Sequence, residues 1–100
     1  MEYTADHSGE RLHVRISGVL TFDDHERFKS IVKLIASGDE TQVTLDLGQT
    51  KMIDSAGIGM LLLANDRAMK ESKKMSLTGV NGHVAKVIEL SKVDQIIPIT

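Results

Sequence analysis

Asp54 and Ser55 place a carboxylate beside a hydroxyl, in the segment MIDSAGIGMLLLA of residues 52–64. A serine acts as a nucleophile when a base lies within hydrogen-bond reach and a further group orients that base. The G-x-S-x-G motif of hydrolases is absent here, because Ile53 and Asp54 precede the serine and neither supplies the glycine that the motif needs. The histidines that would supply a base are scattered over the N-terminus, a strand and two helix starts: His7, His13, His25 and His83. A serine hydrolase therefore ranks last among the hypotheses for Ser55.

Asp54 is predicted to cap a helix that begins at Ser55. Aspartate is a preferred N-cap because its carboxylate accepts hydrogen bonds from free backbone N–H groups. A side chain at the first helical position points outward, where free N–H groups and the helix dipole favour a negative group. A phosphate on Ser55 would be partly accommodated there, although Asp54 beside it would add repulsion. Ser55 is thus redundant for capping and available to a partner.

Metal and cofactor sites are not indicated elsewhere. The chain has no cysteine, which excludes disulfides, thiolate metal sites and a cysteine nucleophile. No histidine pairs with another at ligand spacing, and the acidic patch of Asp23, Asp24 and Glu26 suits the positive end of a helix dipole. Gly57 and Gly59 match neither phosphate-binding glycine motif, so we expect them to let a helix approach its neighbours closely. We expect no metal and no cofactor.

Hydrophobic periodicity predicts the elements that position Asp54 and Ser55. Alternating apolar residues indicate strands at residues 11–17, 41–47, 75–80 and 95–100, with a further strand at 2–6. Helical spacing indicates helices from near Phe22 to Ser37, from Ser55 onward, and over residues 81–90. A turn is expected at residues 48–50, before Met52 and Ile53 finish or extend the strand of residues 41–47. Pro98 favours an edge or terminal position for the last strand. The order of elements indicates an α/β fold with mostly parallel neighbouring strands.

The same periodicity predicts the core. Its strand residues are Leu12, Val14, Ile16, Val43, Leu45 and Leu47. Its residues in the first and third helices are Phe28, Ile31, Val32, Ile35, Val84, Val87 and Ile88. In the helix after Ser55 the inward residues are Ile58, Leu61, Leu62, Asn65 and Met69. The first half of that helix is apolar nearly all round, so we expect little solvent contact there. Thr21 and Asp24 have the spacing of a capping box before the first helix.

Length and composition limit the class of protein. With 100 residues, the chain is expected to form a single domain over residues 1–100. A net charge of -2 and the absence of a basic stripe argue against nucleic-acid binding. The N-terminus lacks a signal-peptide pattern, and no segment approaches the roughly 20 apolar residues of a membrane span. We therefore expect a cytoplasmic protein without membrane insertion.

The segment from Val43 to Ala64, VTLDLGQTKMIDSAGIGMLLLA, resembles the signature of the STAS domain of bacterial anti-sigma factor antagonists. That signature is an alternating strand, a short turn, and D-[ST]-x-G-[LIV]-[GA] opening an aliphatic helix. RISGVLT is similar to the family's strand ending in G-x-L, and NGHVAKVIELSKVDQIIPI resembles its C-terminal helix, break and final strand. The resemblance covers about Leu12 to Ile99. It implies a STAS-like α/β fold, a small mixed β-sheet with packed α-helices.

The resemblance also implies a function. Members of the family act by binding, so we expect no enzyme activity. In the antagonist branch, an anti-sigma factor that is itself a serine kinase of the histidine-kinase-like ATPase type phosphorylates the residue at the position of Ser55. The unphosphorylated antagonist binds that anti-sigma factor, and a PP2C-type serine phosphatase resets the system. By resemblance, Ser55 is the phospho-acceptor and Asp54 its orienting neighbour.

The residues expected to contact a partner lie around this position: Asp54, Ser55, Gly57, Ile58, Thr21 and Asp23. Many antagonists carry an acidic residue after G-x-L, where this chain has Thr21, with Asp23 two positions on. One alternative is a STAS subunit that regulates a lipid-transporting ABC ATPase, in which Ser55 would contact the ATPase without accepting phosphate. The other alternative is the serine hydrolase.

Overall fold

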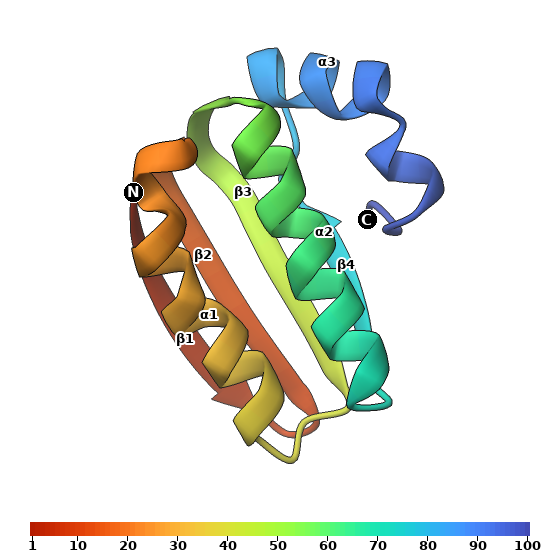
Figure 1. Cartoon of the computed structure of the whole chain (residues 1–100). Helices are drawn as coiled ribbons and strands as arrows, with labels where there is room; N and C mark the ends of the chain where they lie inside the picture. The colour runs from red at the N-terminus through yellow and green to blue at the C-terminus, as the bar shows by residue number, and fades with distance from the viewer.

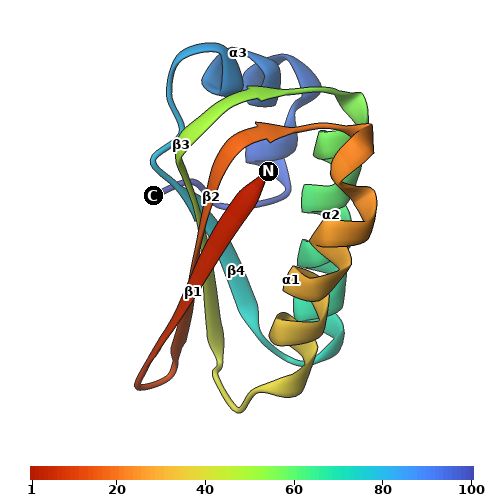
Figure 2. The ribbon, with the colours of Figure 1, turned by 90° about the vertical axis from the view of Figure 1, so that its left-hand side faces the viewer.

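A four-stranded mixed sheet forms one layer of the molecule, and two helices pack side by side on one of its faces (Figures 1 and 2). The computed structural model describes residues 1–100. Its strands are β1 (Glu2–Ser8), β2 (Arg11–Leu20), β3 (Gln42–Ile53) and β4 (Lys74–Thr78). Its helices are α1 (His25–Ser37), α2 (Ser55–Lys70) and α3 (Gly82–Ser91), with short 3-10 turns η1 (Phe22–Asp24) and η2 (Val93–Gln95).

The strands lie in the order β1-β2-β3-β4. β1 runs antiparallel to β2, whereas β2 and β3, and β3 and β4, are parallel pairs. Because successive crossovers move the same way along the sheet, right-handed connections place α1 and α2 on the same face. The opposite face is left open (Figure 2). The predicted fold class, a small mixed sheet with packed helices, is confirmed. None of the helices has the length and hydropathy that crossing a membrane requires.

Alternation along β2 and β3 turns apolar side chains toward the helices. Every strand residue predicted to lie inward is buried: Leu12, Val14, Ile16, Val43, Leu45 and Leu47. The helices contribute Phe28, Ile31, Ile35, Val84 and Ile88 to the same core. Val32 and Val87, which were also predicted to lie inward, are half-buried. The hydrophobic periodicities of the strands and of the helices thus predicted most of the core.

Helix α2 turns only part of the predicted face to the core: Ile58, Leu61 and Asn65 are buried as predicted, but Leu62 and Met69 are not. Its buried residues are Gly57, Ile58, Met60, Leu61, Ala64, Asn65 and Ala68. Leu62 is only half-buried, Leu63 is 51% exposed and Met69 is 66% exposed. Because this helix is apolar on nearly every side, periodicity alone did not distinguish the small inward residues Ala64 and Ala68 from the larger outward ones.

Two predicted boundaries are wrong. β3 does not turn at residues 48–50; it continues unbroken to Ile53, so the predicted extension through Met52 and Ile53 is confirmed and the turn is not, and its register against β2 is irregular. Arg15 pairs with Asp46 and Ser17 pairs with Gln49, so β3 carries an extra residue that bends the strand without ending it. The last strand is reduced to one isolated bridge between Leu77 and Ile99. Pro98 has no N–H to extend that ladder, which explains why pairing stops there.

At the end of the sheet opposite the start of α2, buried polar groups tie several elements together. The Lys73 ammonium donates hydrogen bonds to the carbonyls of Ile35 at 2.6 Å and Gly38 at 2.8 Å, which satisfies the C-terminus of α1. Glu40 is buried beside it and its carboxylate is hydrogen-bonded to His7 of β1. The hydrogen bond from His7 lowers the pKa of Glu40 below its ordinary value, helped by a backbone N–H and the Lys73 charge, and outweighs the opposing effect of burial.

This lowered pKa predicts an acid-dependent loss of stability. A carboxyl group whose folded pKa lies below the unfolded value stabilises the fold above the unfolded pKa, here near 4.5, and stops doing so as the pH falls through the folded pKa. Urea denaturation from about pH 6 down to about pH 3 should therefore show a shallower loss of unfolding free energy for Glu40→Gln than for the wild type. Parallel curves for the two proteins would contradict this role of Glu40.

Candidate functional site

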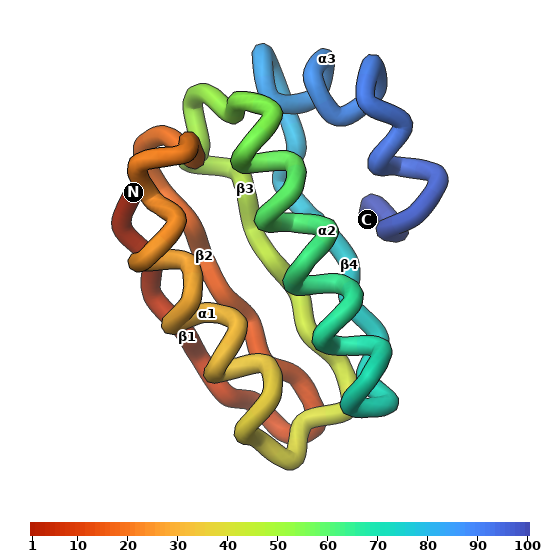
Figure 3. Tube along the Cα trace, in the orientation of Figure 1, coloured from red at the N-terminus to blue at the C-terminus, as the bar shows by residue number.

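Asp54 fixes the start of α2 with both oxygens of its carboxylate. Oδ1 accepts a hydrogen bond from the Gly57 N–H at 2.8 Å, which makes Asp54 the predicted N-cap. Oδ2 accepts a hydrogen bond from the Phe22 N–H at 3.2 Å. Asp54 is in extended conformation, as an N-cap residue should be. The carboxylate therefore joins the start of α2 to the loop that follows β2. Figure 3 shows that these two backbone segments lie at the same end of the molecule.

Ser55 is the first residue of α2 and its side chain is exposed. The first hydrogen bond along the helix runs from the Ile58 N–H to the Asp54 carbonyl at 3.0 Å. The N–H groups of Ser55 and Ala56 lie before that bond, so the helix does not use them. A group carried by Ser55 would meet solvent, free amides and the positive end of the helix dipole.

Gly57 provides the close contact that brings α2 against β2. A Cβ at this position would lie 2.3 Å from the Leu20 carbonyl oxygen and 2.6 Å from Ile53 Cγ1. The expectation that a glycine allows close approach is therefore confirmed for Gly57. It is wrong for Gly59, which is exposed and where a Cβ would meet nothing within 4 Å.

An open apolar groove of about 350 Å³ runs beside Ser55, between α2 and α3. It is lined by Ile53, Asp54, Ser55, Ile58, Val87, Leu90 and Ser91. No lysine or arginine lines it, and its one charged group is the Asp54 carboxylate. Sequence reasoning missed the contribution of α3. The signal that could have revealed it is Leu90, a large apolar residue outside the inward stripe of that helix, which is 75% exposed. The groove offers a partner an apolar surface next to a hydroxyl.

The loop after β2 is organised by Asp24. Its Oδ2 accepts hydrogen bonds from the Thr21 N–H at 2.9 Å and the Thr21 hydroxyl at 3.3 Å, and its Oδ1 accepts one from the Met1 ammonium at 2.8 Å. Burial raises the pKa of Asp24, but the hydrogen bonds from Met1 and Thr21 outweigh it, so the pKa lies below its ordinary value. The predicted capping pair of Thr21 and Asp24 is present.

The structure brings the residues expected to contact a partner to one end of the molecule. Asp54, Ser55 and Ile58 line the groove. Asp23 is exposed in the neighbouring loop, where Phe22 is 71% exposed and is tied to Asp54 through its backbone. The other two expected residues make contacts within the chain: Gly57 packs on β2, and the Thr21 N–H donates a hydrogen bond to Asp24.

Other chemistries have no geometry to support them. The recorded polar contacts of the histidines are with carboxylates, and none joins a histidine to Ser55. No group of three or more histidine, aspartate and glutamate side chains is arranged to hold a metal ion. In the acidic patch at the start of α1, Asp24 forms the capping box with Thr21, and Glu26 lies in the first turn of the helix.

Gly57 and Gly59 should respond oppositely to alanine. Gly57→Ala should lower the free energy of unfolding by about 1–3 kcal/mol, because the new methyl group would overlap the Leu20 carbonyl. Gly59→Ala should raise it by about 0.5–1 kcal/mol, because alanine favours the helix at an open position. Urea denaturation measures both, and a stabilising Gly57→Ala would contradict the close contact.

Asp54 and Ser55 should differ in their importance for folding. Asp54→Ala should lower the free energy of unfolding by about 0.5–2 kcal/mol, since it removes the cap of α2. Ser55→Ala should leave the free energy of unfolding unchanged within about 0.5 kcal/mol, as for an exposed residue without a capping role. Thermal or urea denaturation tests this pair, and an equal loss in both variants would show that Ser55 has a structural role as well.

Comparisons with known proteins identify the family. The family model described as "Mlab, STAS domain" matches residues 3–98. A STAS-domain containing protein of Pseudomonas aeruginosa is 30% identical over 92 residues, which cover 92% of this chain and 90% of that protein. BtrV of Bordetella bronchiseptica, described as a candidate anti-sigma factor antagonist, is 27% identical over 99 residues, covering 99% of this chain and 85% of that protein.

Solved structures agree with this fold. The anti-sigma factor antagonist SpoIIAA in its unphosphorylated form superposes with a TM-score of 0.81 at 17% identity, covering 99% of this chain and 88% of that one. The phosphorylated form of SpoIIAA from Bacillus gives a TM-score of 0.73 at 17% identity, covering 99% of this chain and 91% of that one. Since the family model spans residues 3–98 and the P. aeruginosa relative aligns over nearly the whole chain, this chain belongs to the STAS-domain family.

Proposed function

We propose that this chain is an anti-sigma factor antagonist that is switched by phosphorylation of Ser55. In this proposal residues 1–100 act as one cytoplasmic binding domain without enzyme activity. The unphosphorylated chain binds an anti-sigma factor that is a serine kinase of the histidine-kinase-like ATPase type. Phosphorylation of Ser55 by that kinase releases the chain, and a PP2C-type serine phosphatase restores the binding form.

The observation that carries this proposal is an exposed hydroxyl at the start of α2, at the rim of an apolar groove. Ser55 is free for a kinase to reach, because Asp54 already caps the helix. Ile53, Ile58 and Leu90 provide apolar surface on which a partner can bury a side chain. The same contact surface can therefore bind a partner and be modified at one atom.

The charges around Ser55 explain how a phosphate would release a partner. Asp54 lines the groove and Asp23 is exposed in the adjoining loop, whereas no basic residue lines the groove. A phosphate adds roughly 1.5 to 2 negative charges. These surface charges are screened over about 8–10 Å in physiological salt, so the effect acts on groups in the contact itself. A partner whose surface complements a neutral hydroxyl next to carboxylates would lose that complementarity.

The same charges indicate the chemistry of the partner surface. An aliphatic or aromatic side chain would fill the groove beside Leu90, where exclusion of water gives affinity. A lysine or arginine of the partner would face Asp54 and Asp23, where charge complementarity sets orientation and association rate. Phe22, which is 71% exposed, offers a second apolar contact on the other side of Asp54.

The comparisons support the antagonist branch through what they say of the related proteins. BtrV is described as a candidate anti-sigma factor antagonist, and SpoIIAA is an antagonist that has been solved in unphosphorylated and phosphorylated forms. This chain has a residue that can accept phosphate at the first position of α2.

The alternative is a subunit that regulates a lipid-transporting ABC ATPase. The same groove would then dock on the ATPase, and Ser55 would touch it without accepting phosphate. The two functions differ in one observable, which is phosphate transfer to Ser55. The hydrolase hypothesis needs a base at Ser55, and none is in hydrogen-bond contact with it.

Charge at Ser55 should control partner binding. Ser55→Asp should weaken binding to the anti-sigma factor kinase by at least about tenfold, because it places a further negative charge in the contact. Ser55→Ala should bind like the wild type. Ser30→Asp is the matched control, since it adds the same charge at an exposed position of α1. Isothermal titration calorimetry measures all three, and equal affinities of the two Ser55 variants would count against the switch.

Phosphate transfer distinguishes the two binding functions. The purified chain is incubated with ATP and the kinase encoded near it, and peptides are analysed by mass spectrometry. The antagonist function predicts phosphate on Ser55 and its absence in Ser55→Ala. A chain that binds an ABC ATPase and acquires no phosphate would support the alternative instead.

A further inference from the structure

The open face of the sheet carries polar side chains in cross-strand rows. One row consists of Arg11, Gln42 and Lys74, which pair across β2, β3 and β4. The next row on the same face consists of His13, Thr44 and Ser76. Because α1 and α2 cover only the other face, these side chains are not packed under a helix (Figure 2).

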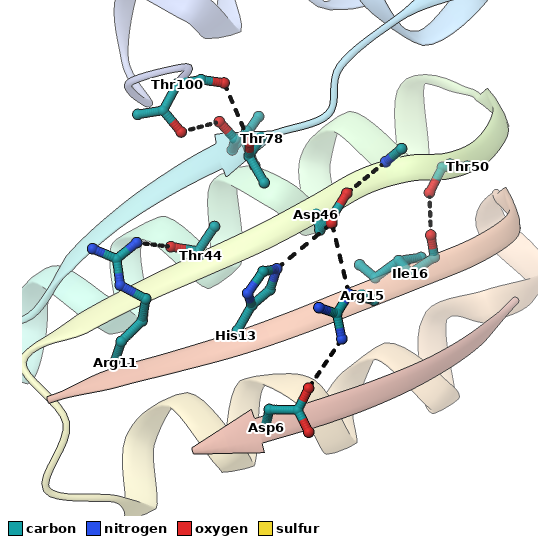
Figure 4. Close-up of polar contacts among 12 residues, drawn as sticks. Asp6, Arg11, His13, Arg15, Ile16, Thr44, Asp46, Thr50, Thr78 and Thr100 are labelled. Carbon is teal, nitrogen blue, oxygen red and sulfur yellow. Dashed lines mark hydrogen bonds and ion pairs between the residues drawn. The ribbon is translucent and has the colours of Figure 1, made fainter. Parts of the chain in front are cut away.

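Arg11 is held in place over this face by neutral partners. Its Nη1 donates a hydrogen bond to Thr44 Oγ1 at 3.2 Å, and its Nη2 donates one to Gln42 Oε1 at 2.8 Å. Figure 4 shows the Arg11 side chain reaching toward Thr44 across the sheet surface. Thr44 is only 4% exposed, although it lies on the open face. The guanidinium is therefore oriented, but its charge is not neutralised by a carboxylate.

This lack of a carboxylate distinguishes Arg11 from the other arginines. Arg15 forms an ion pair with Asp6 at 3.0 Å, Arg27 forms one with Glu2 at 2.8 Å, and Arg67 forms one with Glu71 at 3.6 Å. No ion pair is recorded for Arg11 or for Lys74, two strands away in the same row.

A hollow of about 300 Å³ lies between these two cations. It is lined by Arg11, Gln42, Val43, Thr44, Lys74, Met75, Ser76, Pro98 and Thr100. The lining holds two positive side chains, Arg11 and Lys74, several hydroxyl groups and no carboxylate side chain; Thr100, the last residue, adds one terminal carboxylate, which the two cations outnumber. The groove at Ser55, in contrast, has no basic residue in its lining.

We propose that this hollow binds a tetrahedral oxyanion of the phosphate or sulfate class. A guanidinium has five N–H donors, so the two hydrogen bonds of Arg11 leave others free for an oxyanion. Lys74 adds a mobile ammonium, and the hydroxyl of Ser76 is a further donor. Charge-assisted hydrogen bonds from an oriented arginine are the strong ones in such sites. This site is independent of the proposed function, because it lies on the face away from α2.

Inorganic phosphate is the probe that tests this site. The ¹⁵N-labelled chain is titrated with sodium phosphate while sodium chloride keeps the ionic strength constant. We expect saturable amide shifts that centre on Arg11, Thr44 and Lys74, with a dissociation constant on the order of 1 mM. Arg11→Gln should weaken binding by about tenfold or more, and Lys74→Gln should also weaken it. Arg27→Gln removes an exposed arginine elsewhere and should leave the titration unchanged.

Specific outcomes would overturn the proposal. Shifts that do not saturate, that chloride alone reproduces, or that persist equally in Arg11→Gln would show that phosphate has no site here. Thermal denaturation confirms that each variant is folded, so a loss of binding is not a loss of structure. Glycerol 3-phosphate distinguishes the source of the oxyanion: tighter binding than inorganic phosphate assigns the site to a phosphate ester, and equal binding assigns it to the free ion.

Discussion

The Asp54 carboxylate is the interaction on which the functional end of this molecule depends. It accepts hydrogen bonds from Gly57 in α2 and from Phe22, which lies 32 residues earlier in the chain. The Asp54 N–H also donates to the Leu20 carbonyl at 3.3 Å, and Gly57 packs against that same carbonyl. A strand end, a loop and a helix start are therefore fixed relative to one another at a single point. Ser55 is the next residue in the chain, so its backbone position is fixed as well.

In this arrangement Asp54 has the structural role and Ser55 has the proposed regulatory role. Asp54 stabilises the helix, so Ser55 can change its charge without unfolding α2. In the proposed function, the apolar groove supplies affinity for a partner, and the carboxylates beside Ser55 make the contact sensitive to added negative charge. The open face of the sheet carries mixed charges, with Asp6 and Asp46 near Arg15 and with Arg11 and Lys74 around the hollow. One small fold thus carries the groove at Ser55 and the hollow at Arg11 on different faces.

The sequence predicted those parts of the fold in which one period dominates. Alternation in β2 and β3 identified buried residues such as Val14 and Leu45, and the Asp54 cap followed from residue type and position. The bulge that carries β3 past Gly48 depends on pairing with β2, which a local pattern does not contain. The face of α2 was ambiguous because the helix is apolar all round. Leu90 lies at the candidate site only because α3 packs against β3 near the start of α2, and this long-range contact is not contained in a local sequence pattern.

In the proposed switch, phosphate on Ser55 changes a surface and leaves the fold intact. The most direct test compares the chain fully phosphorylated at Ser55 with the unphosphorylated chain, measuring affinity for the anti-sigma factor kinase and backbone amide shifts in the free protein. The proposed switch predicts an affinity at least about tenfold weaker for the phosphorylated chain, with shift changes confined to the start of α2, the Phe22 loop and the groove. Equal affinities, or shift changes spread through the whole sheet, would contradict it.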